Sequence, residues 1–414
     1  MTILRTVPAL LAFAFSGYAA ASGFQLLEQN ASGLGNAYAG SAAVAENAST
    51  IFFNPAGMTR LQAREVSAGL TPVRPSFKFS NDGSTNFSGS TGGNGGDAGS
   101  WAHVPNAYLS WALNSDLYVG IGLSGPFGLS TEYDADWVGR FQAIKFEIKT
   151  YNINPSVAYR VNDMVSLGFG VNWQRLEAEY VRQTVIPLPA PSPPTTGTIQ
   201  LDADDDAWGW NAGALFQVTP ATRLGVSYRS TIKYALDGGI SGSLSIPASA
   251  DLEVPDTFIL SATHAVDDRW ELLGDLSWTG WSSIDTVNIT RKSDGAVIQP
   301  IDAKFDDTWR VAVGANYKYS DAWRLKGGLA YDQTPAPDAQ HRLAALPDGD
   351  RIWLTLGAQW RPTKTSSMDV GAAYLYIKDT EINNNQVSAG RGLVKGRYDS
   401  SDVRILGVQY SMSF

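Results

Sequence analysis

The sequence predicts an all-β protein, a fourteen-stranded antiparallel transmembrane β-barrel with a small N-terminal hatch that plugs its lumen. Three observations indicate this fold. The chain begins with an export signal, apolar and polar residues alternate along most of the remainder, and Trp or Tyr recurs about eight positions apart on the apolar faces.

The first element, residues 1–21, reads as a secretory signal peptide. A basic start, M-T-I-L-R, precedes a short apolar stretch, and Ala19-Ala20-Ala21 fits the A-x-A cleavage pattern. The apolar run is too short to span a hydrocarbon core of ~30 Å, so we expect cleavage before Ser22 rather than a membrane anchor.

The second element, residues 22–63, is rich in Ala, Gly and Ser and shows no alternation. It therefore predicts a compact segment with little β-structure, and the lumen of a barrel is the simplest place for it.

The third element, residues 64–414, alternates with a period of two. In D-T-W-R-V-A-V-G-A-N-Y-K-Y, Trp309, Val311, Val313 and Tyr317 share one face. A soluble sandwich would turn such faces inward and a membrane barrel would turn them outward. Eight residues of a tilted strand span roughly 20 Å of membrane normal, close to the ~25 Å apolar band between aromatic girdles. The spacing therefore favours the barrel.

Counting the alternating segments gives fourteen strands, an even number. Tight turns alternate with long loops, so short turns mark the periplasmic side and both mature ends should lie there. The last residues, Q-Y-S-M-S-F, suit a closing strand. The expected strands are 64–80, 101–113, 117–130, 146–161, 164–181, 206–218, 221–236, 254–266, 269–282, 305–319, 323–332, 351–361, 366–378 and 403–414.

The third expected strand contains an interruption, Ser124, Gly125, Pro126, Phe127 and Gly128. Proline cannot donate to a strand ladder and glycine offers no side chain to pack, so this run predicts a gap in the wall. The alternative is that the strand ends early in an extracellular loop.

Two separated sets of motifs carry a family resemblance. S-G-F-Q-L, S-G-L-G-N-A-Y-A-G and N-P-A-G lie near the N-terminus, and Y-D-Q-T-P-A-P-D, L-P-D-G-D-R-I-W and M-D-V-G-A-A-Y follow far downstream. In this order they resemble the FadL family of outer-membrane transporters for fatty acids and other hydrophobic compounds. The resemblance covers the whole mature chain. It implies a fourteen-stranded barrel, an N-terminal hatch and a kinked third strand that opens the wall.

The resemblance also implies a mechanism. Hydrophobic molecules, foremost long-chain fatty acids, would bind in the barrel and leave sideways through the kink without an energy source, catalysis or a cofactor. Phe24 would move near the ligand, and Asn54, Pro55 and Ala56 would anchor the hatch. Arg175 is a candidate carboxylate partner, although its segment does not align clearly enough for transfer from the family. The protein is expected as a monomer in the Gram-negative outer membrane, in contact with lipid and lipopolysaccharide.

Other readings remain open at this point. The same route could import aromatic or alkane hydrocarbons, and a surface adhesin or structural barrel, or an open porin, could share the alternation. The net charge of −9 disfavours nucleic acid, and the absence of Cys excludes thiolate metal sites.

Several local motifs favour simple structural roles. G-I-G-L-S-G at 120–125 lacks the following helix that a dinucleotide site needs. His103, His264 and His341 lie far apart in the sequence. The acidic run 202–206 reads as a solvated loop rather than a cation site, and the proline-rich run 187–194 as a landing loop or a stiff spacer.

Overall fold

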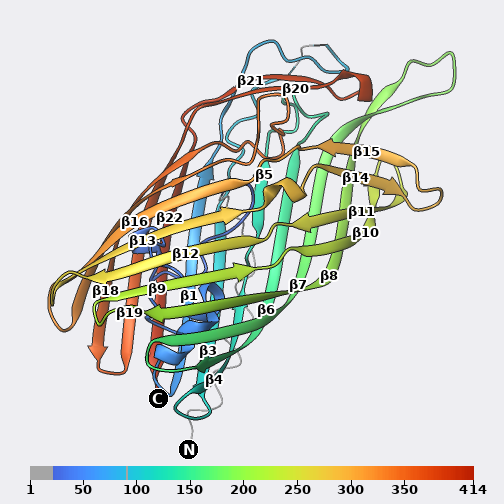
Figure 1. The fold of residues 1–414 in the computed structure, drawn as a ribbon. Coiled ribbons are helices and arrows are strands. Elements are labelled where there is room, and N and C mark those ends of the chain that lie inside the picture. The colour runs from blue at the N-terminus through green and yellow to red at the C-terminus, as the bar shows by residue number, and fades with distance from the viewer. Residues whose placement is uncertain (1–21, 90–91) are drawn as a thin grey trace, which may run out of the picture.

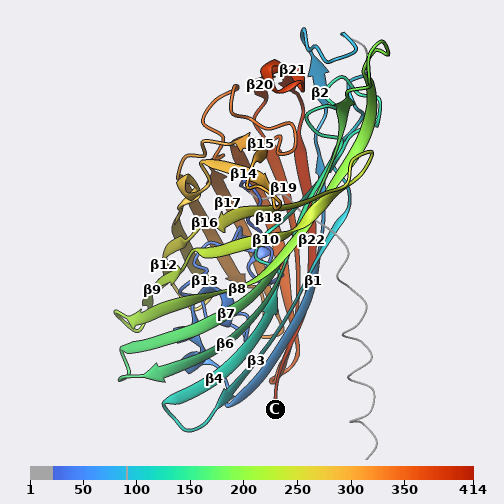
Figure 2. The same cartoon turned by 90° about the vertical axis from the view of Figure 1, so that its right-hand side faces the viewer.

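A closed antiparallel β-barrel forms the body of the protein (Figures 1 and 2). The computed structural model describes residues 22–89 and 92–414, so the expected signal peptide lies outside the described residues. Nineteen strand segments form one sheet, and five wall strands are each split into two segments. The wall therefore has fourteen strands, as predicted. It closes where β1 (Arg64–Ser76) pairs with β3 (Ala102–Ala112) and with β22 (Asp402–Ser413).

Between β3 and β22 the wall strands follow one another in chain order. They are β4 (Leu117–Ser124) with β5 (Gly128–Glu132), β6 (Lys145–Arg160), β7 (Val165–Ile186), β8 (Thr195–Gln217), β9 (Thr222–Arg229) with β10 (Ile232–Gly242), β11 (Ile246–Val254) with β12 (Thr257–Ala265), β13 (Trp270–Thr279) with β14 (Thr286–Arg291), β15 (Val297–Asp302) with β16 (Thr308–Lys318), β17 (Trp323–Asp332), β18 (Arg351–Thr363) and β19 (Ser366–Ile377).

The apolar faces point outward, which confirms the barrel and excludes the sandwich. On β16, Trp309, Val311 and Val313 are 47%, 49% and 57% exposed, whereas Arg310 between them is buried in the lumen. An exposed hydrocarbon face of this extent is stable only in contact with lipid.

The predicted tight turns join the strands at one end, and the C-terminus lies at that same end (Figure 1). At the other end the strands are longer than predicted. β8 begins at Thr195 rather than at 206, and β11, β14 and β15 were missed. The reason is that this part of the wall rises above the lipid, where outward side chains meet water and the apolar alternation is lost.

Two loop predictions are wrong for that reason. The acidic run 202–206 is part of β8, not a loop. The stretch 182–205, which the expected strands 164–181 and 206–218 leave as a loop, belongs mostly to a β7–β8 hairpin whose connection is only 187–194. A small separate sheet of β2 (Phe79–Asn81), β20 (Thr380–Gln386) and β21 (Gly392–Tyr398) lies at the same loop end (Figure 1).

Short helices occur mainly within residues 22–63. They are η1 (Leu34–Asn36), α1 (Thr50–Phe53) and η2 (Pro55–Arg60), and elsewhere η3 (Trp281–Ser283) and η4 (Val387–Ala389). Across residues 22–89 and 92–414, none of the helices is long and apolar enough to cross a membrane.

Residues 22–63 lie within the ring of strands and contribute no wall strand (Figures 1 and 2). Glycines in the wall allow residues 22–63 to approach the wall strands closely. A Cβ at Gly168, Gly213 or Gly225 would lie 2.2, 2.1 or 2.0 Å from an atom of this segment. No other residue fits such contacts without a shift, so the wall sequence is matched to the segment inside it.

Candidate transport pathway

The third wall strand is broken at Gly125–Phe127, the run singled out in the sequence. β4 ends at Ser124, which pairs with Asn152, and β5 begins at Gly128, which pairs with Lys149. Three residues on the broken strand thus face two on β6, so the chain carries one extra residue and bulges. Phe127 is buried inside the barrel.

The backbone groups freed by the break have partners inside the barrel. The carbonyls of Gly125 and Pro126 accept hydrogen bonds from the Gln29 side chain at 2.8 Å and from the Leu26 amide at 2.7 Å. The Gly128 amide donates to the Phe24 carbonyl at 2.8 Å. Proline 126 has no amide to satisfy. The N-terminal segment therefore substitutes for the missing strand ladder, which is what makes a break tolerable in a membrane wall.

Beside the break, the strand ladder of the wall is interrupted between β3 and β5, and we call this gap the side opening. Residues 102–106 of β3 pair with β1 on one side, but within the described residues no ladder joins them to β5 on the other. A cavity lies in this gap. It is lined by Leu26, His103, Val104, Pro105, Gly125, Phe127, Gly128, Lys149, Thr150 and Tyr151.

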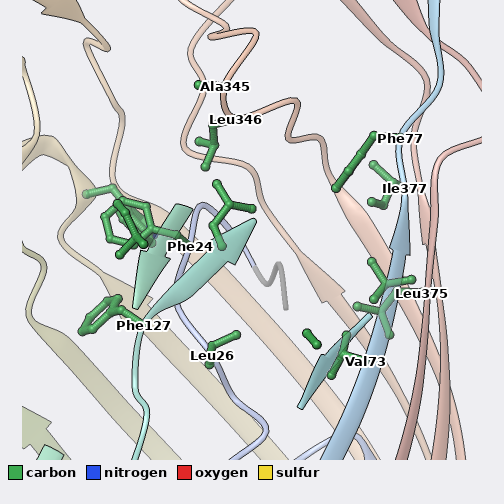
Figure 3. Close-up of a cluster of buried hydrophobic side chains, with 14 of the residues drawn as sticks. Phe24, Leu26, Val73, Phe77, Phe127, Ala345, Leu346, Leu375 and Ile377 are labelled. Carbon is green, nitrogen blue, oxygen red and sulfur yellow. The ribbon is translucent and has the colours of Figure 1, made fainter. Parts of the chain in front are cut away.

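Leu26 and Phe127 separate this opening from the lumen. Both also line a second cavity on the inner side, between the N-terminal segment and β9, β12 and β13. Figure 3 shows Phe24 and Phe127 close together, with Leu26 below them and Leu346 above.

Phe24 packs in an aromatic cluster next to the break. Its ring centroid lies 4.9 Å from that of Trp281 and 5.8 Å from that of Phe127. The Phe24 side chain also lines an apolar pocket. One side chain thus contacts both this pocket and the broken strand.

The apolar pocket occupies the part of the barrel above the lipid. Its walls come from inward-facing residues of β6, β7, β8, β10, β11, β14 and β15, and from Leu343 and Leu346 in the loop after β17. Apart from Ser249 and the Tyr180 hydroxyl, the lining side chains are hydrocarbon. A buried hydrocarbon ligand is the chemistry that such a surface binds.

Two buried arginines lie beside Tyr180, which lines this pocket. Arg182 is 8% exposed and donates to Gln299 at 2.9 Å, and Arg391 is 7% exposed and donates to Gln386 at 2.9 Å. Both guanidinium groups act electrostatically on Tyr180. None of the ion pairs among the described residues involves either arginine, so the two charges have no anionic partner there.

Burying the two charged guanidinium groups close together costs free energy. On β7 the exposed apolar stretch ends near Trp173, so Arg182 lies beyond the membrane-spanning part of the strand. Burial lowers the pKa of Arg182 to about 10, and repulsion from Arg391 lowers it as well. Burial also lowers the pKa of Arg391. Both arginines remain protonated at neutral pH. An anion bound between them would offset the free energy lost by burying two unpaired positive charges.

Two other residues expected from the sequence, Asn54 and Arg175, lie inside the barrel and on its outer surface respectively. Asn54 donates to the carbonyls of Ala42 at 2.7 Å and of Ala214 on β8 at 3.0 Å, and its own side-chain oxygen accepts from Ala56 at 3.1 Å. Arg175 does not line the apolar pocket. It lies on the outward face of β7 and pairs with Glu177, Asp204 and Asp206.

The glycines of the G-I-G-L-S-G motif have a structural role in the wall. Gly120 and Gly122 are strand residues of β4, and a Cβ at Gly120 would lie 2.6 Å from Ile51 and Met58. No group of three or more His, Cys, Asp or Glu side chains in the described part of the chain could hold a metal ion.

Sequence reasoning missed Leu26, Trp281, Arg182 and Arg391. Leu26 follows Phe24 by two positions, the spacing of one face of an extended segment, which was a usable signal. The arginines come from β7 and from the loop before β21, which only the fold brings together.

An exposed apolar outer surface, a filled lumen and an internal hydrocarbon pocket define an outer-membrane transport barrel for hydrophobic compounds. Comparison with known proteins agrees. Residues 12–414 match the family model described as "Outer membrane protein transport protein (OMPP1/FadL/TodX)", and the chain belongs to this family.

Three relatives show the extent of the similarity. Outer membrane protein P1 of Haemophilus influenzae is 33% identical over 90% of this chain and 89% of its own. The long-chain fatty acid transport protein of Escherichia coli O6:H1 is 29% identical over 89% of this chain and 90% of its own. The crystal structure of a Pseudomonas aeruginosa FadL homologue is 27% identical, covers 95% of this chain and all of its own, and superposes with a TM-score of 0.87.

Proposed function

We propose that this barrel imports long-chain carboxylic acids passively across the outer membrane. The observation that carries the proposal is the hydrocarbon pocket with two buried arginines, Arg182 and Arg391, that have no acidic partner among the described residues. A fatty acid supplies both a chain for the pocket and a carboxylate for the cations. The similarity to the long-chain fatty acid transport protein of Escherichia coli supports the same substrate class.

Uptake needs no energy source in this proposal. Each buried CH₂ group favours the hydrocarbon environment by ~0.8 kcal/mol, so a long chain is drawn into the membrane once it has passed the polar lipopolysaccharide layer. The protein only has to provide a dry path across that layer.

The proposed path runs from the pocket past Phe24 to the side opening. Phe24 contacts both the pocket and Phe127 at the break, and its carbonyl holds Gly128. When residues 24–26 move, the ligand leaves sideways between β3 and β5. The remainder of residues 22–63 acts as the fixed hatch, with Asn54, Pro55 and Ala56 at its anchored end.

A second substrate class has its own support. Phe24, Phe146, Tyr180 and Phe305 surround the pocket, and aromatic rings also suit neutral aromatic or alkane hydrocarbons. An adhesin, by contrast, has no need of an internal hydrocarbon pocket.

One experiment separates these substrates. The protein is produced in Gram-negative cells that lack their own hydrophobic-compound transporter, and uptake of a labelled long-chain acid is compared with that of an alkane of equal length and of toluene. We expect the acid to be favoured. Mass spectrometry of material co-purified with the barrel provides an independent check. Uptake of the neutral compounds alone would replace the acid with a hydrocarbon as substrate, and uptake of none would overturn the transport proposal.

A further inference from the structure

The side opening lies at the level where the outer surface of the barrel changes from apolar to polar. On β6 the outward residues Val157 and Ile153 are exposed and apolar, and Tyr151 and then Lys149 follow them towards the loop end. On the neighbouring β7 and β8, Trp173 pairs with Trp208, which is 67% exposed. Exposed Trp and Tyr mark the membrane interface in barrels. The opening therefore faces the boundary between hydrocarbon and head groups.

The two edges of the opening differ in chemistry from its interior. Leu26, Val104 and Phe127 line its inner part, whereas His103 and Lys149 stand on its outward edges, one on β3 and one on β6. The hydrocarbon chain of an acid in the opening would contact the apolar inner residues. Its carboxylate would lie at the membrane interface, next to the polar side chains on the outer edges.

Lys149 shares its acidic partner with a second cation. Its ammonium lies 3.3 Å from the Glu147 carboxylate, which is also 3.5 Å from Lys145. Lys145 is bound more closely elsewhere, at 2.7 Å from Glu179. Glu147 thus keeps a second cation when Lys149 turns towards another carboxylate. Lys149 is 29% exposed, so this exchange takes place at an accessible surface.

We infer that Lys149, with His103 and Tyr151, forms a head-group site on the outer rim of the side opening. The site receives the carboxylate of the departing acid at the interface while the chain enters the outer leaflet. It makes exit faster for acids than for neutral compounds of the same length. This inference rests on the proposed function and adds a specificity-determining residue outside the pocket.

The test uses the full-length barrel reconstituted in lipid vesicles. Transfer of a fluorescent long-chain acid from the barrel into the bilayer is timed against transfer of its methyl ester, and equilibrium binding of both is measured separately. In Lys149→Gln, we expect the acid to transfer roughly two- to fivefold more slowly, as for loss of an exposed ion pair. Ester transfer and binding of both compounds should stay unchanged, and Lys149→Arg should restore the acid rate.

The matched control is Lys233→Gln, an exposed lysine of β10 that is ion-paired with Glu253 away from the opening, and it should change neither rate. His103→Gln is the second variant if Lys149→Gln does not fold, as judged by heat-modifiable migration, and it should slow the acid alone. Equal slowing of acid and ester, or an unchanged acid rate in these variants, would overturn the head-group site while leaving transport intact. Failure of the unaltered barrel to transfer either compound would instead overturn the proposed function.

Discussion

At the scale of single residues, Phe24 is the most informative position because it contacts the pocket and the break at once. Replacing Phe24 with Ala removes an apolar contact of ~1.5 to 3 kcal/mol at the ligand rather than in the wall. We expect uptake of a long-chain acid to fall several-fold while the barrel stays folded. Phe87→Ala is the control, since Phe87 is exposed in a loop. Unchanged uptake kinetics in Phe24→Ala would remove this residue from the mechanism.

Arg182 and Arg391 decide between an acid and a neutral substrate. Replacing both with Met should weaken binding of a long-chain acid by at least tenfold, since charge-assisted hydrogen bonds contribute about 1.5–3 kcal/mol each. Binding of an alkane should hold or improve, because two uncompensated buried charges are gone. Arg175→Met is the matched control on the outer face of β7. Isothermal titration calorimetry with both ligands measures these affinities. An equal loss of affinity for the acid and the alkane would argue against a carboxylate site.

At the scale of elements, the wall and residues 22–63, the proposed hatch, fit each other through glycine. Gly225→Ala should destabilise the barrel by about 1 to 3 kcal/mol, because the new Cβ would lie 2.0 Å from the Ala42 carbonyl and the hatch must shift. Gly274→Ala is the control, since no atom lies within 4 Å of that position. Denaturant unfolding in vesicles measures the difference. Equal stability of the two variants would mean that the hatch is loosely held.

The sequence was informative at this scale wherever lipid imposes alternation. The outward apolar faces, the short turns and the strand count were predicted correctly, and Pro126 between two glycines marked the break. The upper strands were missed because water outside and ligand or protein inside impose no such period, as the acidic residues on β8 show. The arginine pair could not be predicted, since β7 and the loop before β21 meet only in the folded barrel.

At the scale of the whole molecule, we propose that cargo leaves through the wall and not along the barrel axis. The register offers a direct way to close the wall. Three residues, Gly125 to Phe127, face two on β6, so deleting Pro126 and changing Gly125 to Val would allow one continuous strand from Ser124 into β5. That strand would pair with β6 on one side and could pair with residues 102–106 of β3 on the other, which closes the opening.

The decisive measurement is uptake of a long-chain acid by this closed-wall variant, after its structure has shown continuous pairing and titration has shown that it still binds the acid. We expect a folded barrel that binds its ligand and no longer delivers it to the cell. Normal uptake through a wall shown to be closed would contradict lateral exit.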